Sequence, residues 1–363
     1  MFYALGIFFV SFILLLFIYI ISRFRKYYLL SKVANKKVGW ILSILPAVFF
    51  TIYIIFDRVN GILVLLHLSL FTMICDLIFK IIEKIRKKKF KYYFSGICAL
   101  VITVVYFSIA AFFFYHVYET KYDIKTDKDL GIDKLRVVQI SDSHLGDTMS
   151  SSRFSSYIDG INKTYPDVIF ITGDFIDDDT PKEEMIKGCE ALKRLKSKYG
   201  TYYINGNHDK GYFNSRDYTY DDLKSYLSMN NVQILEDEIV NLNENIVVIG
   251  RLDSSYKERK SIDILINDIA KDKYIIVLDH KPDDYEALEK AKVDLVLSGH
   301  THGGHIFPTG QIAVLFGIND LRYGLDKRGD TNFIVNSGIA GWAIKFKTGT
   351  ISEYGIIDIS MNR

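Results

Sequence analysis

The sequence predicts a transmembrane region of four helices at the N-terminus, followed by a water-soluble α/β domain. Long apolar runs fill the first 118 of 363 residues, and short apolar runs alternate with amphipathic segments after residue 133. Residues 1–122 contain 15 Lys and Arg against 4 Asp and Glu, whereas residues 123–363 contain 30 against 39. A basic, apolar first third before an acidic remainder indicates a membrane region joined to a soluble domain and disfavours a nucleic-acid binder.

Four apolar runs cover residues 2–22, 38–56, 61–82 and 93–118, and we assign residues 1–118 to the membrane region. Each run is long enough to cross the hydrocarbon core of a bilayer as a helix. The first run lacks the basic start and the small-residue cleavage site of a secretory signal peptide. We therefore expect it to remain in the protein as a span.

Two basic loops predict the orientation of these spans. Residues 23–37 and residues 83–92 each contain six Lys or Arg. Loops of this kind stay on the cytoplasmic side of a membrane. With four spans, everything after residue 118 then lies outside the cytoplasm. We expect a multi-pass protein of the cell membrane whose soluble domain lies on the extracytoplasmic side.

Residues 119–133 are polar and charged, and we expect a linker there, before a soluble domain at 134–363. Strands alternating with helices predict an α/β domain whose sheets are covered by helices. The expected strands are 134–141, 167–172, 201–205, 232–235, 245–250, 274–279, 293–298, 332–336 and 353–359. The expected helices are 151–164, 181–198, 219–229, 261–271 and 283–291.

Residues with metal-binding side chains follow five of the expected strands. In an open α/β sheet, ligands bind outside the carboxyl ends of the strands. A single histidine at such a place is more often an ordinary surface or core residue, but five strand ends in succession predict a metal site. Their ligands suffice for two divalent ions. In chain order these residues are Asp142, His144, Asp174, Asn207, His280, His300 and His302.

The chain resembles the calcineurin-like metallophosphoesterases over roughly residues 134–360. It looks most like the membrane-attached bacterial branch of that family, because the last motif continues with Gly303 and Gly304. The resemblance implies a four-layer α-β-β-α sandwich, with two sheets packed together and the metals at the sheet edge. The matching blocks are Asp142-x-His144, Gly173-Asp174, Gly206-Asn207-His208-Asp209, His280 and Gly299-His300-Thr301-His302.

The resemblance also implies two metal ions with a bridging hydroxide that attacks the phosphorus of a phosphoester. Mixed nitrogen and oxygen ligation suits manganese, which we expect, or iron or zinc. The implied ligands of one ion are Asp142, His144, Asp174 and His302. Those of the other ion are Asp174, Asn207, His280 and His300, so that Asp174 bridges the pair.

His208 is the implied catalytic residue beside the metals. It adjoins Asn207, and by resemblance it stabilises the phosphoryl oxygens or protonates the leaving group. Asp177 matches the position that orients this histidine in some members of the family, although a solvated loop carboxylate is the alternative. Asp209 is interpreted first as part of the turn and only second as a site residue.

Several positions stay open. His305 stands where relatives often carry glutamine, so it either contacts substrate or caps its loop. Arg251 follows the strand expected at 245–250 and either binds a phosphate or, as the safer interpretation, makes a surface salt bridge. Lys345 lies where the family commonly has an arginine. Three aromatic residues form either an apolar rim facing lipid or part of the core: Trp342, Phe346 and Phe307.

The sequence thus predicts a membrane-tethered metallophosphoesterase that acts on a lipid-linked or envelope phosphoester. Two alternatives remain. One is a phosphodiesterase for soluble nucleotides with a passive anchor, and the other is a membrane sensor with an inactive phosphoesterase domain. The expected partners are the phosphoester substrate and membrane lipid, with no nucleic acid, and the sequence leaves the oligomeric state open.

Overall fold

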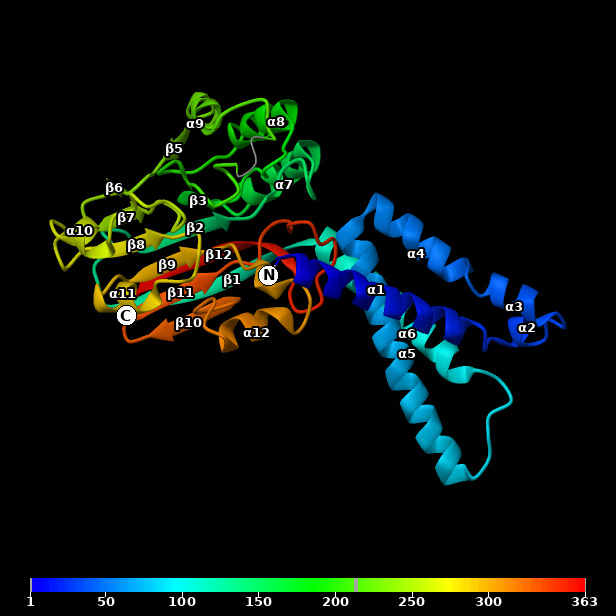
Figure 1. Ribbon diagram of the computed structural model, residues 1–363. Coiled ribbons are helices and arrows are strands. Elements are labelled where there is room, and N and C mark those ends of the chain that lie inside the picture. Colours follow the sequence, from blue (N-terminus) through cyan, green and yellow to red (C-terminus); the bar gives the residue numbers. More distant parts are fainter. Residues whose placement is uncertain (1, 212–214, 363) are drawn as a thin grey trace. The chain divides into compact units, whose positions relative to one another are not determined.

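The computed structural model describes residues 2–211 and 215–362, with the side chains of all of these except residues 2–7, 9 and 28. The chain forms two compact units, Met1–Ala110 and Ala111–Arg363 (Figure 1). The described part of the first unit is helical, and the second unit contains the described strands. The expected order, apolar helices followed by an α/β domain, is confirmed.

The first unit is built from apolar helices. Among the described residues, three stretches are long and apolar enough to cross a membrane, namely Lys36–Phe56, Arg58–Arg86 and Phe94–Tyr115. They correspond to the second, third and fourth expected runs and indicate membrane association. In the first expected run, residues 2–7 and 9 have no described side chains, and the apolar stretch that remains, Val10–Phe24, is shorter. The helices are α1 (Phe2–Phe24), α2 (Tyr28–Ser31), α3 (Lys36–Leu42), α4 (Leu45–Phe56), α5 (Arg58–Arg86) and α6 (Phe94–Tyr115).

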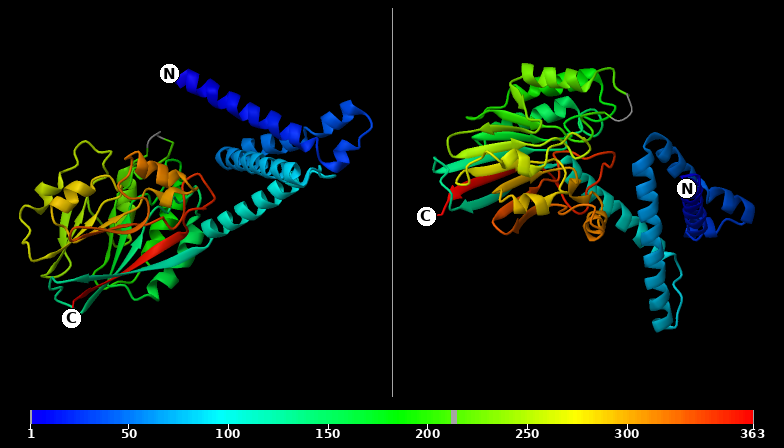
Figure 2. Two further views of the ribbon diagram at one scale, coloured as in Figure 1. Left: turned by 90° about the horizontal axis from the view of Figure 1, so that it is seen from below. Right: turned by 60° about the vertical axis from the view of Figure 1, so that its left-hand side comes forward.

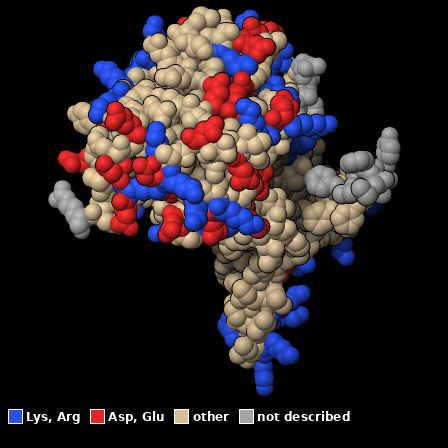
Figure 3. Space-filling view, turned by 90° about the vertical axis from the view of Figure 1, so that its left-hand side faces the viewer, with Lys and Arg blue, Asp and Glu red and all other residues tan. Residues whose placement is uncertain are grey.

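Charged side chains in the first unit are concentrated near the helix ends. The last turn of α5 carries Lys84 and Arg86, and Lys and Arg gather at this end in Figure 3. Deeper in the unit, Arg23 Nη1 lies 3.2 Å from Asp76 Oδ2, and the Ser95 hydroxyl donates a 2.6 Å hydrogen bond to Asp76 Oδ1. The buried carboxylate of Asp76 is therefore paired with a cation, which an apolar environment requires.

The second unit contains two six-stranded sheets. In the first sheet one internal pair of strands is antiparallel and the other pairs are parallel, whereas in the second sheet the two edge pairs are antiparallel and the inner pairs are parallel. The first sheet has the order β1 (Val117–Thr126), β12 (Ser352–Met361), β2 (Lys134–Ile140), β3 (Val168–Thr172), β4 (Thr201–Ile204) and β5 (Val232–Ile234). The second has the order β10 (Gly324–Arg328), β11 (Thr331–Val335), β9 (Leu295–Ser298), β8 (Tyr274–Leu278), β7 (Ile246–Gly250) and β6 (Glu238–Asn241).

Buried apolar side chains form three clusters in this unit. The central strands are rich in Val and Ile, which suit a sheet that is buried on both faces. One cluster combines residues of both sheets, such as Phe170 and Ile276. The other two join the first sheet to α7 (Ser151–Asn162), α8 (Lys182–Leu192) and α9 (Tyr220–Met229), and the second sheet to α10 (Ile262–Ile266) and α11 (Tyr285–Lys290).

The expected linker at 119–133 is wrong for its first half. Residues 117–126 form β1, which pairs in parallel with β12 from Val117↔Ser352 to Thr126↔Met361 (Figure 2). Charged residues alternate along β1 because it is an edge strand with much of its surface in water, so its composition resembles that of a linker. The expected fourth run, 93–118, is too long for the same reason, since α6 ends at Tyr115.

The nine expected strands are all present, with small differences at their ends. The five expected helices are also present, and all but α9, which ends at Met229 as expected, are shorter at their C-terminal ends. Two short edge strands, β6 and β10, and the helix α12 (Thr309–Leu315) were not expected from the sequence. Helix starts follow recognisable caps. The Ser150 side chain accepts from Arg153 N before α7, and Thr219 and Asp222 form a capping box at α9.

Replacing Ile276 with Ala tests the packing between the two sheets. Ile276 on β8 is fully buried in the cluster that joins them. Ile276→Ala should lower the free energy of unfolding by about 2–5 kcal/mol, because it removes buried methyl groups and leaves a cavity. Thermal denaturation of the detergent-solubilised chain measures this. Ile264→Ala is the matched control, since Ile264 is 64% exposed, and an equal loss in both variants would contradict the assignment.

Candidate metal centre

The carboxyl ends of the two sheets meet through hydrogen bonds between their loops. Within the first sheet, Asp142 N donates to Gly173 O at 3.0 Å, which joins the loops after β2 and β3. Between the sheets, His300 N donates to Asp142 Oδ1 at 2.9 Å. His280 Nδ1 lies 2.8 Å from Thr172 O, at the end of β3. Residues far apart in the sequence are thereby held around one point.

The backbone is strained at five of the seven possible metal ligands. Five residues other than glycine have positive φ, a region that side chains with a Cβ rarely adopt. Such strain persists only where the surrounding structure enforces it, and it clusters at functional sites. The residues are Asp142 (52°), His144 (40°), Asp174 (51°), His300 (70°) and His302 (48°).

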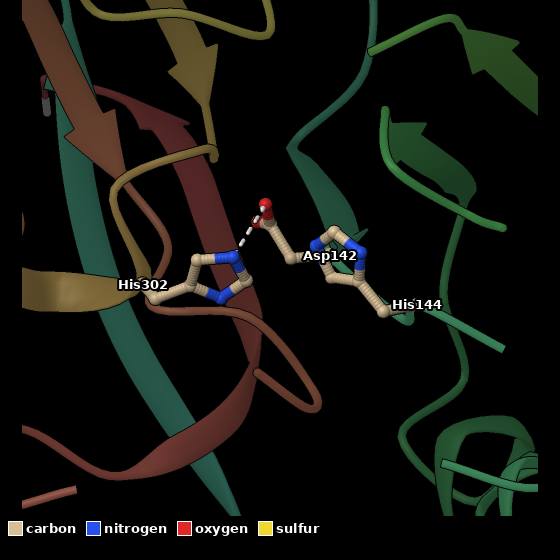
Figure 4. Close-up of side chains that lie close together, drawn as sticks. All are labelled: Asp142, His144 and His302. Atoms are coloured by element: carbon tan, nitrogen blue, oxygen red, sulfur yellow. Dashed lines mark ion pairs between the residues drawn. The ribbon is translucent and has the colours of Figure 1, made fainter. Parts of the chain in front are cut away.

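Asp142, His144 and His302 form a first cluster of possible ligands. One ligand atom from each lies within 4.8 Å of the others, and all three residues are buried. His302 Nε2 is 3.8 Å from Asp142 Oδ1 (Figure 4). The three side chains come from the loops after β2 and β9, one loop from each sheet.

Asp174, His280 and His300 form a second cluster within the same 4.8 Å limit. Asp174 Oδ2 lies 3.1 Å from His280 Nε2 and 3.7 Å from His144 Nε2. One carboxylate oxygen is thus within reach of histidines from both clusters, which is the position that a bridging ligand requires.

Asn207 belongs to the same place through its neighbours. The next residue, His208, donates its backbone N–H to Asp174 Oδ1 at 2.9 Å. Gly206, on the other side, is so close that an added Cβ would meet Asp174 Oδ1 at 2.2 Å. Asn207 Oδ1 is buried and has no hydrogen-bond partner within the described residues. A buried oxygen of this kind is normally satisfied, so it fits a metal ligand.

Contacts of the Nδ1 atoms orient the rings of His144 and His280. His144 Nδ1 lies 3.0 Å from Asp177 Oδ2, and His280 Nδ1 lies 2.8 Å from Thr172 O. A ring that donates from Nδ1 to an oxygen presents the lone pair of Nε2, the form that binds a metal. His144 Nε2 is also buried without a hydrogen-bond partner among the described residues. The side chains present therefore fit divalent cations.

Burial shifts two of these histidines toward the neutral form. Burial and the nearby charge of His280 lower the pKa of His300 to about 3. Burial and the neighbouring His305 lower the pKa of His302 well below its usual range. Neutral imidazole is the form that coordinates metal ions.

His208 lies beside the clusters with a carboxylate on either side of its Nδ1 atom. Nδ1 is 3.1 Å from Asp177 Oδ1 and 2.9 Å from Asp178 Oδ2. Burial lowers the pKa of His208, but the hydrogen bond to Asp177 and the charge of Asp174 outweigh this and raise it to about 9. The sequence connected Asp177 to His208, with a solvated loop carboxylate as the alternative for Asp177, and did not identify Asp178 as a second contact. Adjacent carboxylates could not be told apart without the loop geometry.

Asp209 stabilises the turn, which agrees with the first interpretation of this residue from the sequence. Its buried carboxylate accepts backbone N–H groups of Asp174 and Gly206, both at 2.8 Å, and of Ile176 at 3.0 Å. Burial and the charge of Asp174 raise the pKa of Asp209 to about 6. This side chain holds the loops after β3 and β4 together beneath the possible ligands.

The expected surface salt bridge of Arg251 is wrong in its location. Arg251 is buried, and its guanidinium lies 2.7 Å from Asp279 Oδ2 and 2.8 Å from Asp284 Oδ2. Arg259 Nη2 lies 2.5 Å from the same Asp279 oxygen. Asp279 precedes His280, so these ion pairs fix the loop behind that histidine. No local feature of the sequence around Arg251 indicates that this side chain is buried.

The segment after β9 and the loop before β12 contain residues whose roles the sequence left open. His305 is buried, and its Nε2 accepts a 3.4 Å hydrogen bond from Trp342 N. The Trp342 ring lies 5.1 Å from the His208 ring. The fully buried cation of this loop is Lys347, where the sequence drew attention to Lys345. Lys347 Nζ donates to Ser337 O at 2.5 Å, and burial lowers its pKa to about 7.

Comparison with known proteins gives a consistent picture. Residues 135–304 match the sequence model of the family described as calcineurin-like phosphoesterase. An uncharacterised metallophosphoesterase of Aquifex aeolicus is 32% identical over 197 residues, which cover 52% of this chain and 71% of that protein. A metallophosphoesterase of Helicobacter pylori is 31% identical over 63% of this chain. The chain spans only 59% of that protein's length. A bovine transmembrane protein with a metallophosphoesterase domain is 28% identical over 61% of this chain and 52% of its own length.

Asp209→Ala tests whether the turn beneath the clusters supports metal binding. The substitution leaves three buried N–H groups without their acceptor, so manganese affinity should fall by about 10–100-fold. Isothermal titration calorimetry of the solubilised chain with Mn²⁺ measures this. Asp221→Ala is the control, because the Asp221 side chain is 86% exposed. Unchanged affinity in Asp209→Ala would contradict the supporting role.

Proposed function

The chain belongs to the calcineurin-like phosphoesterase family, and from this we propose that it hydrolyses a phosphoester at a dinuclear metal centre in its second unit. The observation that carries the proposal is the place of Asp174, whose Oδ2 lies near both His144 and His280. The three apolar clusters of this unit also support a four-layer α-β-β-α arrangement of the metallophosphoesterase type.

We assign the ligands in two sets that share Asp174. Two bound divalent ions would supply a water of lowered pKa and positive charge to stabilise the phosphoryl oxygens. Nitrogen and oxygen donors together favour manganese, with iron or zinc as alternatives, over magnesium or calcium. One set is Asp142, His144, Asp174 and His302, and the other is Asp174, Asn207, His280 and His300.

We assign His208 as the residue that protonates the leaving group. Its raised pKa, about 9, keeps the ring protonated at neutral pH. Because Nδ1 contacts the carboxylates of Asp177 and Asp178, we propose that His208 donates the proton on Nε2 to the substrate. Asp177 also contacts His144 Nδ1, so we assign it as the positioning residue for both rings.

The substrate that we propose is a lipid-linked or envelope phosphoester. The apolar helices support membrane association, and a single residue, His116, separates α6 from β1. So short a connection keeps the second unit near the bilayer and raises its effective concentration toward phosphoesters there. The two basic loops at 23–37 and 83–92 support an extracytoplasmic position for this unit.

Hydrolysis of bis-p-nitrophenyl phosphate by the solubilised, manganese-loaded chain tests the chemistry. Asp174→Asn should abolish turnover and metal binding, since the shared ligand is weakened for both ions. His208→Ala should lower kcat by about 10²–10⁴-fold with metal binding intact. A chelator should remove activity, and added Mn²⁺ should restore it.

Asp263→Asn on the exposed surface of α10 is the control for the carboxylate change and should behave as wild type. A folded, manganese-loaded chain that turns over neither this compound nor lipid phosphates would contradict the proposal and favour an inactive sensor domain. Activity confined to soluble nucleotides would favour the passive-anchor alternative.

Cysteine labelling in intact bacterial cells tests the orientation. In a background without Cys75, Cys98 and Cys189, Tyr165→Cys should react with a membrane-impermeant maleimide, because Tyr165 is 82% exposed in the second unit. Lys87→Cys, in the basic loop after α5, should react only after the cells are permeabilised. The reverse pattern would place the second unit in the cytoplasm.

A further inference from the structure

The loop that carries His300 and His302 leads into α12, whose surface is apolar and exposed. Leu315 is 80% exposed and Phe316 is 74% exposed. Apolar patches of this kind on a soluble domain mark binding surfaces. We define the α12 surface as the six exposed apolar residues of this segment: Phe307, Ile312, Val314, Leu315, Phe316 and Ile318.

This segment differs from the rest of the second unit in its charge. Residues 303–319 contain no Asp, Glu, Lys or Arg, whereas residues 123–363 as a whole contain 69 of them. Acidic and basic side chains are interspersed over the face of the second unit drawn in Figure 3. An uncharged segment with exposed Leu, Ile and Phe has the composition of a structure that inserts into the headgroup region of a bilayer.

The α12 surface is attached rigidly to the loop of the metal ligands. The backbones of Gly304 and Gly310 approach so closely that a Cβ on Gly304 would lie 2.5 Å from Gly310 Cα. Arg322 Nη1 donates to Gly303 O at 3.1 Å, and the Thr309 hydroxyl hydrogen-bonds to Gly304 O. Anything that binds the α12 surface therefore also orients the loop of His300 and His302.

The segment of α12 is connected through the loop before β12 to the last turn of α6, which belongs to the second unit. Phe307 N donates to Thr348 Oγ1 at 2.9 Å, in the loop before β12. A Cβ on Gly341, in that loop, would meet the Phe114 ring at 2.8 Å, and at the start of β12 Ser352 Oγ donates to Phe114 O at 2.8 Å. A connected series of contacts thus runs from the end of an apolar helix to α12.

Trp342 lies in this series, next to the proposed catalytic residue. Trp342 is 47% exposed, and the centroid of its ring lies 5.1 Å from that of the His208 ring. Trp342 N bonds to His305, and Ala343 N donates to Asp147 Oδ2 at 2.8 Å, so the loop is fixed on both sides of the ring. Tryptophan is enriched at the headgroup level of membrane proteins.

We propose that the α12 surface and Trp342 form an interfacial membrane-binding surface that holds the mouth of the metal site at the level of the lipid headgroups. The occupant is the bilayer, because the surface is uncharged and apolar, and because the contacts described above connect it to the end of α6, a candidate membrane span. The surface does not depend on the proposed hydrolysis. It explains how a lipid phosphoester would reach His208 without leaving the membrane.

Tryptophan quenching by brominated lipid tests the proposal on the full chain. The protein has two tryptophans, Trp40 and Trp342, so Trp40→Phe leaves Trp342 as the reporter. A second variant adds Phe316→Trp to a chain in which both tryptophans are Phe. In vesicles of phosphatidylcholine and phosphatidylglycerol brominated at acyl carbons 6 and 7, both reporters should be quenched about twofold or more.

Tyr165→Trp, in the chain without native tryptophans, is the matched control. Tyr165 is exposed and precedes β3, at the opposite end of that strand from Asp174, so its fluorescence should be unchanged. Reporters at 316 and 342 that respond to aqueous acrylamide and not to brominated lipid would overturn the proposal. Reporters that respond to neither would also overturn it, by showing that protein covers the surface.

Turnover of bis-p-nitrophenyl phosphate in the same vesicles separates the two proposals. Quenching without turnover would support the membrane-binding surface and contradict the hydrolase. Turnover without quenching would support the hydrolase and contradict the surface.

Discussion

The buried carboxylates of Asp142 and Asp174 are the constraint on which the second unit depends. Both are almost completely buried where the ends of two sheets meet. A buried anion is strongly unfavourable unless cations and hydrogen-bond donors surround it. The loops supply backbone N–H groups from His300 and His208, and imidazole rings from both sheets. Metal ions would supply the remaining positive charge, and the positive φ values around the site are the strain that this convergence requires.

A second set of contacts connects the proposed metal ligands to the proposed acid. Asp177 places one carboxylate oxygen near His144 and the other near His208. The orientation of a metal ligand and that of a proton donor therefore depend on one side chain. Beneath it, Asp209 fixes the loops after β3 and β4, and the ion pairs of Asp279 fix the loop of His280. The ring of His144 and the loops of Asp174 and His280 are thus positioned by buried polar groups.

Strand topology brings the end of the apolar helix α6 and the proposed metal site to the same edge of the second unit. β12 is antiparallel to β2, so Ser352 lies near the carboxyl end of β2, where Asp142 follows. β1 is parallel to β12 and begins opposite Ser352, so the chain leaves α6 at this edge. The proposed catalytic site, the end of an apolar helix and the α12 surface therefore share one end of the second unit. This arrangement fits a substrate that is presented at a membrane.

The sequence by itself determined the apolar helices, the alternation of strands and helices, and the residues at the ends of β2, β3, β4, β8 and β9. These depend on local patterns, namely apolar run length, periodicity and the polar residues that follow a strand. Tertiary structure alone decided which polar groups are paired. Arg251 and Asp279 are 28 residues apart, and Asp209 and Asp174 are 35 apart. Edge strand β1 resembled a linker because its alternating charges face water. The exposure of α12 depends on tertiary contacts, which a local sequence pattern does not predict.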